Sequence, residues 1–342
     1  MQKVAVITGA GAGVGRATAL EFAHKGWDVA LLSRDPARLE SLAGDIRELG
    51  QRALPIPTDV ADPEAVEAAA ERTEAELGPI GAWVNVAMAT VFAPVADLTA
   101  AEALRTTEVT YLGQVYGMMA ALRRMRTRSG GVIVNVGSAL AYRSVPLQSV
   151  YCGAKAAIRG FTDSLRSEIL HDKLDVRLTM VHLPAVNTPQ FDWALNKTGH
   201  MATPVPPIYQ PEVPARAIYF AATHDRREIW VGFPTVKAIL GNRVAPGLID
   251  QYLASAGYSG QMSDRLKPAD APNNLFSPVS GYDTAHGRFD DRARTWSPEM
   301  VTDRHKTAVL GGLAVLALLA LKAILTQRPR RHGGKSHRSV NR

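Results

Sequence analysis

The chain has 342 residues, 46% of them hydrophobic, which excludes a disordered chain and is enough for one large domain with extensions. Its single cysteine, Cys152, excludes a disulfide framework. The formal net charge of +7 comes from residues 304–342, which hold nine basic and no acidic residues, so residues 1–303 carry 30 basic against 32 acidic residues. The main part of the chain therefore lacks a basic stripe, and we expect no nucleic-acid partner.

Predicted strands and helices alternate along the first 231 residues. Apolar runs predict seven strands, at 3–8, 28–33, 52–57, 82–86, 131–136, 175–181 and 228–231. Helices are predicted at 16–25, 36–48, 62–77, 101–125 and 148–171. This alternation is typical of an α/β, Rossmann-type doubly wound parallel sheet with helices on both faces, in which ligands bind at the carboxyl ends of the strands.

A glycine-rich turn, Gly9 to Gly15 with Gly13 and Val14, follows the first strand and opens the first helix. Glycines let backbone amides approach a pyrophosphate, and the helix N-terminus adds a favourable dipole. A tight turn without a ligand is the alternative. The strand–turn–helix context favours a dinucleotide.

The second strand ends at Ser33, followed by Arg34 and Asp35. An acidic residue at this place accepts from the ribose hydroxyls of NAD, whereas a cation binds the 2′-phosphate of NADP. Arg34 therefore predicts NADP(H), because the guanidinium matches a phosphate. Asp35 could pair with Arg34 or face solvent, so NAD(H) stays possible.

Tyr151 and Lys155 are four residues apart in a predicted helix and share one face. A free phenol has a pKa of about 10, and a nearby positive charge lowers it. The hydroxyl of Ser138, at the end of the fifth strand, could hold a carbonyl oxygen beside the phenol. The trio would serve carbonyl reduction or alcohol oxidation, although the pair alone could be an ordinary surface pair.

Together the motifs resemble the short-chain dehydrogenase/reductase family over roughly residues 1–250. The motifs are, in chain order, Thr8-Gly9-x-x-x-Gly13-x-Gly15, Asp59-Val60, Asn85-x-Ala87, Ser138 and Tyr151-x-x-x-Lys155. The resemblance implies that Tyr151 is the acid/base, that Lys155 binds the nicotinamide ribose and tunes Tyr151, and that Ser138 orients the substrate oxygen.

The resemblance also implies that Asp59 and Val60 contact the adenine and that Asn85 and Ala87 line the cofactor groove. It implies a homo-oligomer, packed through the helices near 101–125 and 148–171. No metal is expected, because the histidines show no shared ligand spacing.

The sequence departs from the family pattern at three places. Met88 replaces a glycine, and Pro184 takes a glycine position while Thr188 keeps its place beside the cofactor. Thr110 stands where the family has an asparagine that relays protons through water. A vestigial catalyst that acts as a membrane-attached sensor or scaffold is the alternative function, and the same fold performing epimerisation or dehydration is a third.

Residues 188–214 combine many prolines with large apolar side chains such as Phe191 and Trp193, which predicts a lid over a hydrophobic substrate; a plain surface loop is the alternative. We expect the catalytic domain to span 1–255 and 256–303 to be a polar linker.

Residues 307–325 contain one charge, Lys322. At 1.5 Å per residue a helix here spans roughly 28 Å, close to a membrane core, so we expect membrane attachment; a buried or interfacial helix is the alternative. No signal peptide is evident, so we expect a cytoplasmic catalytic domain. The basic tail at 326–342 conflicts with that orientation, and the topology stays open.

Overall fold

A computed structural model of the chain describes residues 3–128 and 130–297. The hydrophobic segment 307–325 and the basic tail lie outside these described residues. Within the described residues, no helix is both long and apolar enough to cross a membrane. The membrane helix therefore stays a prediction from sequence.

The centre of the described chain is a seven-stranded parallel sheet. Its strands are β1 (Val4–Thr8), β2 (Asp28–Ser33), β3 (Ala53–Pro57), β4 (Ala82–Asn85), β6 (Gly131–Ser138), β7 (Val176–Leu183) and β11 (Glu228–Trp230). They pair in the order β11-β7-β6-β4-β1-β2-β3, and every neighbouring pair is parallel. The prediction of a doubly wound parallel sheet is confirmed.

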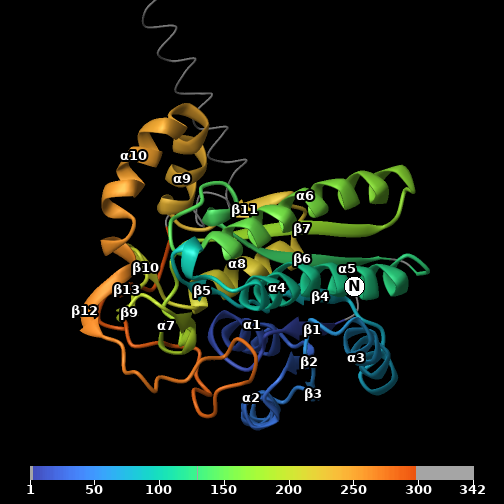
Figure 1. Cartoon of the computed structure of the whole chain (residues 1–342). Coiled ribbons are helices and arrows are strands. Elements are labelled where there is room, and N and C mark those ends of the chain that lie inside the picture. Colours follow the sequence, from blue (N-terminus) through green and yellow to red (C-terminus); the bar gives the residue numbers. More distant parts are fainter. Residues whose placement is uncertain (1–2, 129, 298–342) are drawn as a thin grey trace, which may run out of the picture. The chain divides into compact units, whose positions relative to one another are not determined.

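Helices cover both faces of this sheet (Figure 1). The first face packs against α1 (Gly13–His24), α2 (Pro36–Glu48) and α8 (Glu212–Thr223). The second face packs against α3 (Pro63–Glu76), α5 (Gly113–Met125) and α6 (Ser149–His171).

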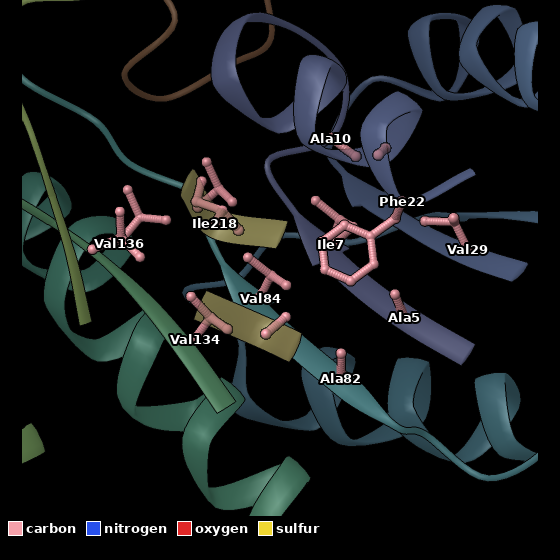
Figure 2. Close-up of a cluster of buried hydrophobic side chains, with 14 of the residues drawn as sticks. Ala5, Ile7, Ala10, Phe22, Val29, Ala82, Val84, Val134, Val136 and Ile218 are labelled. Carbon is pink, nitrogen blue, oxygen red and sulfur yellow. The ribbon is translucent and has the colours of Figure 1, made fainter. Parts of the chain in front are cut away.

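Successive residues of a strand point to opposite faces, and β1 shows how the sequence fills both sides. Ala5 and Ile7 belong to the first buried cluster together with Phe22 of α1 (Figure 2). Val4 and Val6 belong to the second cluster, on the other side of the sheet. An uninterrupted apolar run is therefore what a strand buried on both faces requires.

The long helix predicted at 101–125 is interrupted. It consists of α4 (Ala100–Thr107), a π-helical turn (Glu108–Leu112) and α5. Thr99 begins α4 with a capping box, because its hydroxyl accepts from the Glu102 amide and the Glu102 carboxylate accepts from the Thr99 amide. Such π-helical turns occur frequently at functional sites, and this one carries Thr110.

The segments predicted as an irregular lid and a polar linker pair with each other and with the domain. β5 (Val91–Phe92) pairs with β8 (Leu195–Asn196), β9 (His200–Ala202) with β12 (Met262–Leu266), and β10 (Ile208–Tyr209) with β13 (Ala293–Arg294). Leu275 and Phe289 are buried in the extension. The described part of 256–303 is thus packed structure and not a linker, because a few isolated apolar residues anchor an otherwise polar segment.

The remaining elements surround the carboxyl edge of the sheet. They are the short helix α7 (Gln190–Trp193), the helices α9 (Phe233–Val244) and α10 (Pro246–Ala256), and 3₁₀ turns at Val95–Asp97, Ala139–Ala141 and Ser259–Gln261. Helices α9 and α10 lie next to each other beyond the end of β11 (Figure 1).

Candidate active site

A cavity of about 1430 Å³ opens at the carboxyl edge of the sheet. All but two of the predicted site residues line it, namely Gly9, Gly13, Val14, Gly15, Arg34, Asp59, Val60, Ala87, Ser138, Tyr151, Lys155 and Thr188. The two exceptions are Asn85 and Thr110. The parallel sheet explains the gathering, because residues that follow different strands meet at one edge.

The glycine-rich turn has no room for side chains at its ends. A Cβ atom on Gly15 would lie 2.0 Å from the carbonyl oxygen of Gly9. Gly9 has a φ of +68° and a Cβ there would meet the Ala87 Cα at 2.8 Å. The Thr8 hydroxyl accepts from the amides of Val86 and Ala87 and ties the end of β1 to the end of β4. This bare backbone at a helix N-terminus fits a pyrophosphate.

Asn85 does not line the cavity with its side chain, contrary to the prediction. Its amide oxygen accepts from Trp83 Nε1 at 2.9 Å, and its amide nitrogen donates to Asn135 Oδ1 at 2.9 Å. Asn85 is still inside β4, with the same orientation as Trp83, so its side chain enters the second cluster. Ala87, two residues later and beyond the strand, does line the cavity.

Thr110 is buried away from the cavity, which does not fit the predicted proton relay. Its hydroxyl donates to the Ala89 carbonyl at 2.8 Å and accepts from the Ala89 amide at 2.9 Å. A hydroxyl has a single proton to donate, and this one is used on the backbone. Thr110 therefore fixes the loop that follows Met88 instead of holding a water for Lys155.

The predicted catalytic trio is assembled at the end of β6 and the start of α6. The Tyr151 phenol is hydrogen-bonded to the Ser138 side chain, and Ser138 Oγ also accepts from the Leu140 amide at 3.1 Å. Lys155 Nζ donates to the Val136 carbonyl at 2.7 Å and lies 5.6 Å from the centre of the Tyr151 ring.

Burial controls the protonation of this trio. Desolvation lowers the pKa of Lys155 to about 7, because its ammonium is enclosed. Desolvation raises the pKa of Tyr151, and the hydrogen bond from Ser138 offsets only part of that effect. Tyr151 is therefore protonated near neutral pH and can donate a proton to an oxygen held beside Ser138.

A cluster of arginines marks the other end of the cavity, past β2. Asp35 also lines the cavity, and its carboxylate caps α2 at the amides of Ala37 and Arg38 and pairs with Arg38 Nε at 3.3 Å. Arg34 and Arg38 both line the cavity. Arg38 was missed from sequence, and helical spacing from Arg34 could not identify it, because Arg34 precedes the N-cap of α2.

Arg105 of α4 is a third cation at this end, and nothing in the sequence pattern identified it. It forms an ion pair with Asp59 and donates through Nε to the Leu275 carbonyl at 3.2 Å. The pKa of Arg34 is lowered, first by burial and then by the charges of Arg105 and Arg38, against the opposing effect of Asp59. An additional anion would relieve this repulsion.

The cavity beyond Tyr151 is mostly apolar. The predicted lid contributes Phe191 and Val205, and α10 contributes Leu248 and Tyr252. Trp193 of the lid lies instead at the arginine end, with its ring centre 4.5 Å from the Arg38 guanidinium. Leu248 is 70% exposed and Tyr252 is 66% exposed, so they form an apolar rim at the mouth. This end suits a hydrophobic ligand.

A family model described as short chain dehydrogenase matches residues 3–198. The chain is 30% identical over 331 residues to the uncharacterized oxidoreductase YxnA of Bacillus subtilis (strain 168), which covers 94% of this chain and 90% of that protein. It is also 39% identical over 183 residues to the probable oxidoreductase EphD of Mycobacterium tuberculosis (strain ATCC 25618 / H37Rv), which covers 53% of this chain but only 31% of that protein.

Solved structures are similar over about two thirds of the chain. An alcohol dehydrogenase from Thermococcus sibiricus complexed with 5-hydroxy-NADP has a TM-score of 0.58 and 26% identity, covering 68% of this chain and 95% of that one. L-Sorbose reductase from Gluconobacter frateurii, complexed with NADPH and L-sorbose, has a TM-score of 0.59 and 25% identity, covering 67% and 95%.

Proposed function

Because the chain belongs to the short-chain dehydrogenase family and is an oxidoreductase that interconverts alcohols and carbonyl compounds with a nicotinamide dinucleotide, we propose that it uses NADP(H) on a hydrophobic substrate. The observation that carries the cofactor choice is the environment of Arg34. Its guanidinium lines the cavity with that of Arg38, while Asp35 is committed to the cap of α2. The guanidinium of Arg34 suits the 2′-phosphate, and Arg38 adds a second cation whose charge is partly balanced by Asp35.

The dinucleotide, when bound, supplies or accepts the hydride. Ser138 and Tyr151 hold the substrate oxygen from two sides, since their hydroxyls are already hydrogen-bonded neighbours. Tyr151 donates its proton to the oxygen during reduction and takes it back during alcohol oxidation. The Lys155 ammonium, held by the Val136 carbonyl, stabilises the phenolate that Tyr151 leaves behind.

The apolar end of the cavity supports a substrate with a substantial hydrophobic part. Phe191 and Val205 line its wall, and Leu248 and Tyr252 form its rim. Each methylene that this wall removes from water contributes about 0.8 kcal/mol to binding. The catalytic efficiency should therefore rise with alkyl chain length in a series of ketones that share one carbonyl position.

The experiment that tests this function is oxidation of NADPH by the purified full chain across such a ketone series, followed by absorbance. Turnover that increases with chain length, and that is lost in Tyr151→Phe, supports the proposal. Tight NADPH binding with no turnover across the panel would instead support the sensor or scaffold alternative, which the engaged hydroxyl of Thr110 keeps relevant.

Membrane attachment through residues 307–325 is a separate proposal that the sequence alone supports. It predicts that the full chain sediments with membranes in alkaline carbonate, and recovery in the supernatant would refute it. Assembly of a homo-oligomer through the helices at 101–125 and 148–171 also stays a prediction.

A further inference from the structure

A segment of the C-terminal extension, residues 273–287 and called here the strap, contacts the groups that would bind the phosphates. It passes beside α2 and α7 as the orange loop of Figure 1. The Gly13 amide donates to the Thr284 carbonyl at 3.0 Å. Arg34 donates to the carbonyls of Asn274 and Leu275, and Arg38 Nε donates to the Gly281 carbonyl at 2.6 Å.

These contacts share one chemical character. Each carbonyl oxygen of the strap is an acceptor with partial negative charge, as a phosphate oxygen is, and each faces a donor of the dinucleotide site. A guanidinium has five N–H groups, so Arg34 and Arg38 could serve a carbonyl and a phosphate together. A backbone amide has one proton, so Gly13 cannot donate fully to Thr284 and to a pyrophosphate oxygen at once.

The strap is anchored at both ends. At one end Leu275 is buried in the second cluster. At the other end His286 lies between two carboxylates, with Nε2 at 2.8 Å from Glu212 and Nδ1 at 2.6 Å from Asp290. The end with Leu275, where Val279 is also buried, can therefore stay fixed while residues 281–287 move away. This movement breaks the His286 contacts, so their strength sets how firmly the strap is held.

We propose that the strap is an internal ligand of the dinucleotide site, which competes with the cofactor for the Gly13 amide and must leave the glycine-rich turn before the pyrophosphate can bind. The proposal rests on the proposed function in one respect, that a dinucleotide binds at this turn. Free energy that holds the strap closed is then subtracted from the affinity for the cofactor. Weakening the His286 anchor should tighten binding.

The first measurement is NADPH affinity of the full chain by fluorescence titration. His286→Ala removes an anchor without changing a cavity residue, and His171→Ala, at the exposed end of α6, is the matched control. A partly exposed ion pair contributes up to about 1 kcal/mol, so His286→Ala should bind NADPH on the order of two- to fivefold more tightly. The control should bind as the unmodified chain does.

The second measurement is hydrogen exchange of residues 281–287 in the unmodified chain, with and without NADPH. Competition predicts faster exchange when NADPH is bound, since the strap is released. If the strap instead covers the cofactor and adds to its binding, exchange slows and His286→Ala binds more weakly. Slower hydrogen exchange with NADPH, or an NADPH affinity of His286→Ala that is unchanged or reduced, overturns the proposal. Failure of NADPH to bind the unmodified chain, His286→Ala and His171→Ala alike refutes the proposed function itself.

Discussion

Replacement of Gly15 by alanine is the sharpest test of the glycine-rich turn. The added Cβ would lie 2.0 Å from the Gly9 carbonyl oxygen, and contacts under 3.0 Å are essentially never seen for such atoms. The obstacle is backbone, so the start of α1 and the end of β1 must separate by about 1 Å at least. Overpacking of this kind typically costs about 1–3 kcal/mol, which corresponds to about 5- to 150-fold in affinity where the strain falls on a binding site.

The matched control is Gly44→Ala in α2, where an added Cβ meets nothing within 4 Å. Alanine is favoured over glycine inside a helix by about 0.8–1 kcal/mol, so this variant should be slightly more stable than the unmodified chain. Gly15→Ala should bind NADPH about 5- to 150-fold more weakly and should melt at a lower temperature. Titration and thermal melting measure both effects. Normal NADPH affinity in Gly15→Ala would refute the assignment of this turn to the pyrophosphate.

Three further predictions concern individual side chains. Tyr151→Phe should lower kcat by about 100- to 10,000-fold, because the general acid is lost, while the Kd for NADPH changes less than twofold. Comparable losses in kcat and in NADPH affinity would argue for a structural role of Tyr151. Arg34→Gln should raise the ratio of the NADPH dissociation constant to the NADH dissociation constant about tenfold or more, since only NADPH has the 2′-phosphate. Release of the strap would affect the binding of both dinucleotides alike and would leave this ratio unchanged. An unchanged ratio would therefore contradict the assignment of Arg34 to the 2′-phosphate. Burial lowers the pKa of His286, but the hydrogen bonds to Glu212 and Asp290 outweigh this effect, so the net shift of the pKa is upward. The charged imidazole therefore stabilises the folded chain below about pH 6.5, and this contribution is lost as the pH rises through the raised pKa. The difference in Tm between the unmodified chain and His286→Gln should therefore shrink from pH 5 to pH 9, and a constant difference would exclude this linkage.

The sheet could be predicted because its strands are buried on both faces. A run such as the one around Val6 and Ile7 must be apolar without interruption, and the same is true of β2 and β6. The positions of Ser138 and Arg34 follow from the sheet alone, because each comes at or just after a strand end.

Asn85 and Thr110 show where sequence reasoning failed. Whether Asn85 faces the cavity depends on where β4 ends, and one residue of difference reverses the direction of its side chain. The role of Thr110 depends on the Ala89 backbone, which lies 21 residues away and is brought close by tertiary packing. Neither fact has a periodic signature.

The strap was missed for a related reason. Leu275 and Val279 are its buried apolar residues, and Phe289 follows just past its end; these are too few among polar neighbours to define a helical or strand period. The carbonyl groups that contact Gly13 and Arg34 belong to the backbone, which sequence composition does not reveal.

The pairing of β10 with β13 has a consequence for the order of events during synthesis. Ile208 and Tyr209 have their strand partners at Ala293 and Arg294, and Ala202 of β9 has its partner at Met262. A nascent chain emerges from its N-terminus, so the seven-stranded sheet can form once β11 has left the ribosome, while the lid still lacks its partners. The substrate side of the cavity is therefore completed last, only after residue 294 has emerged.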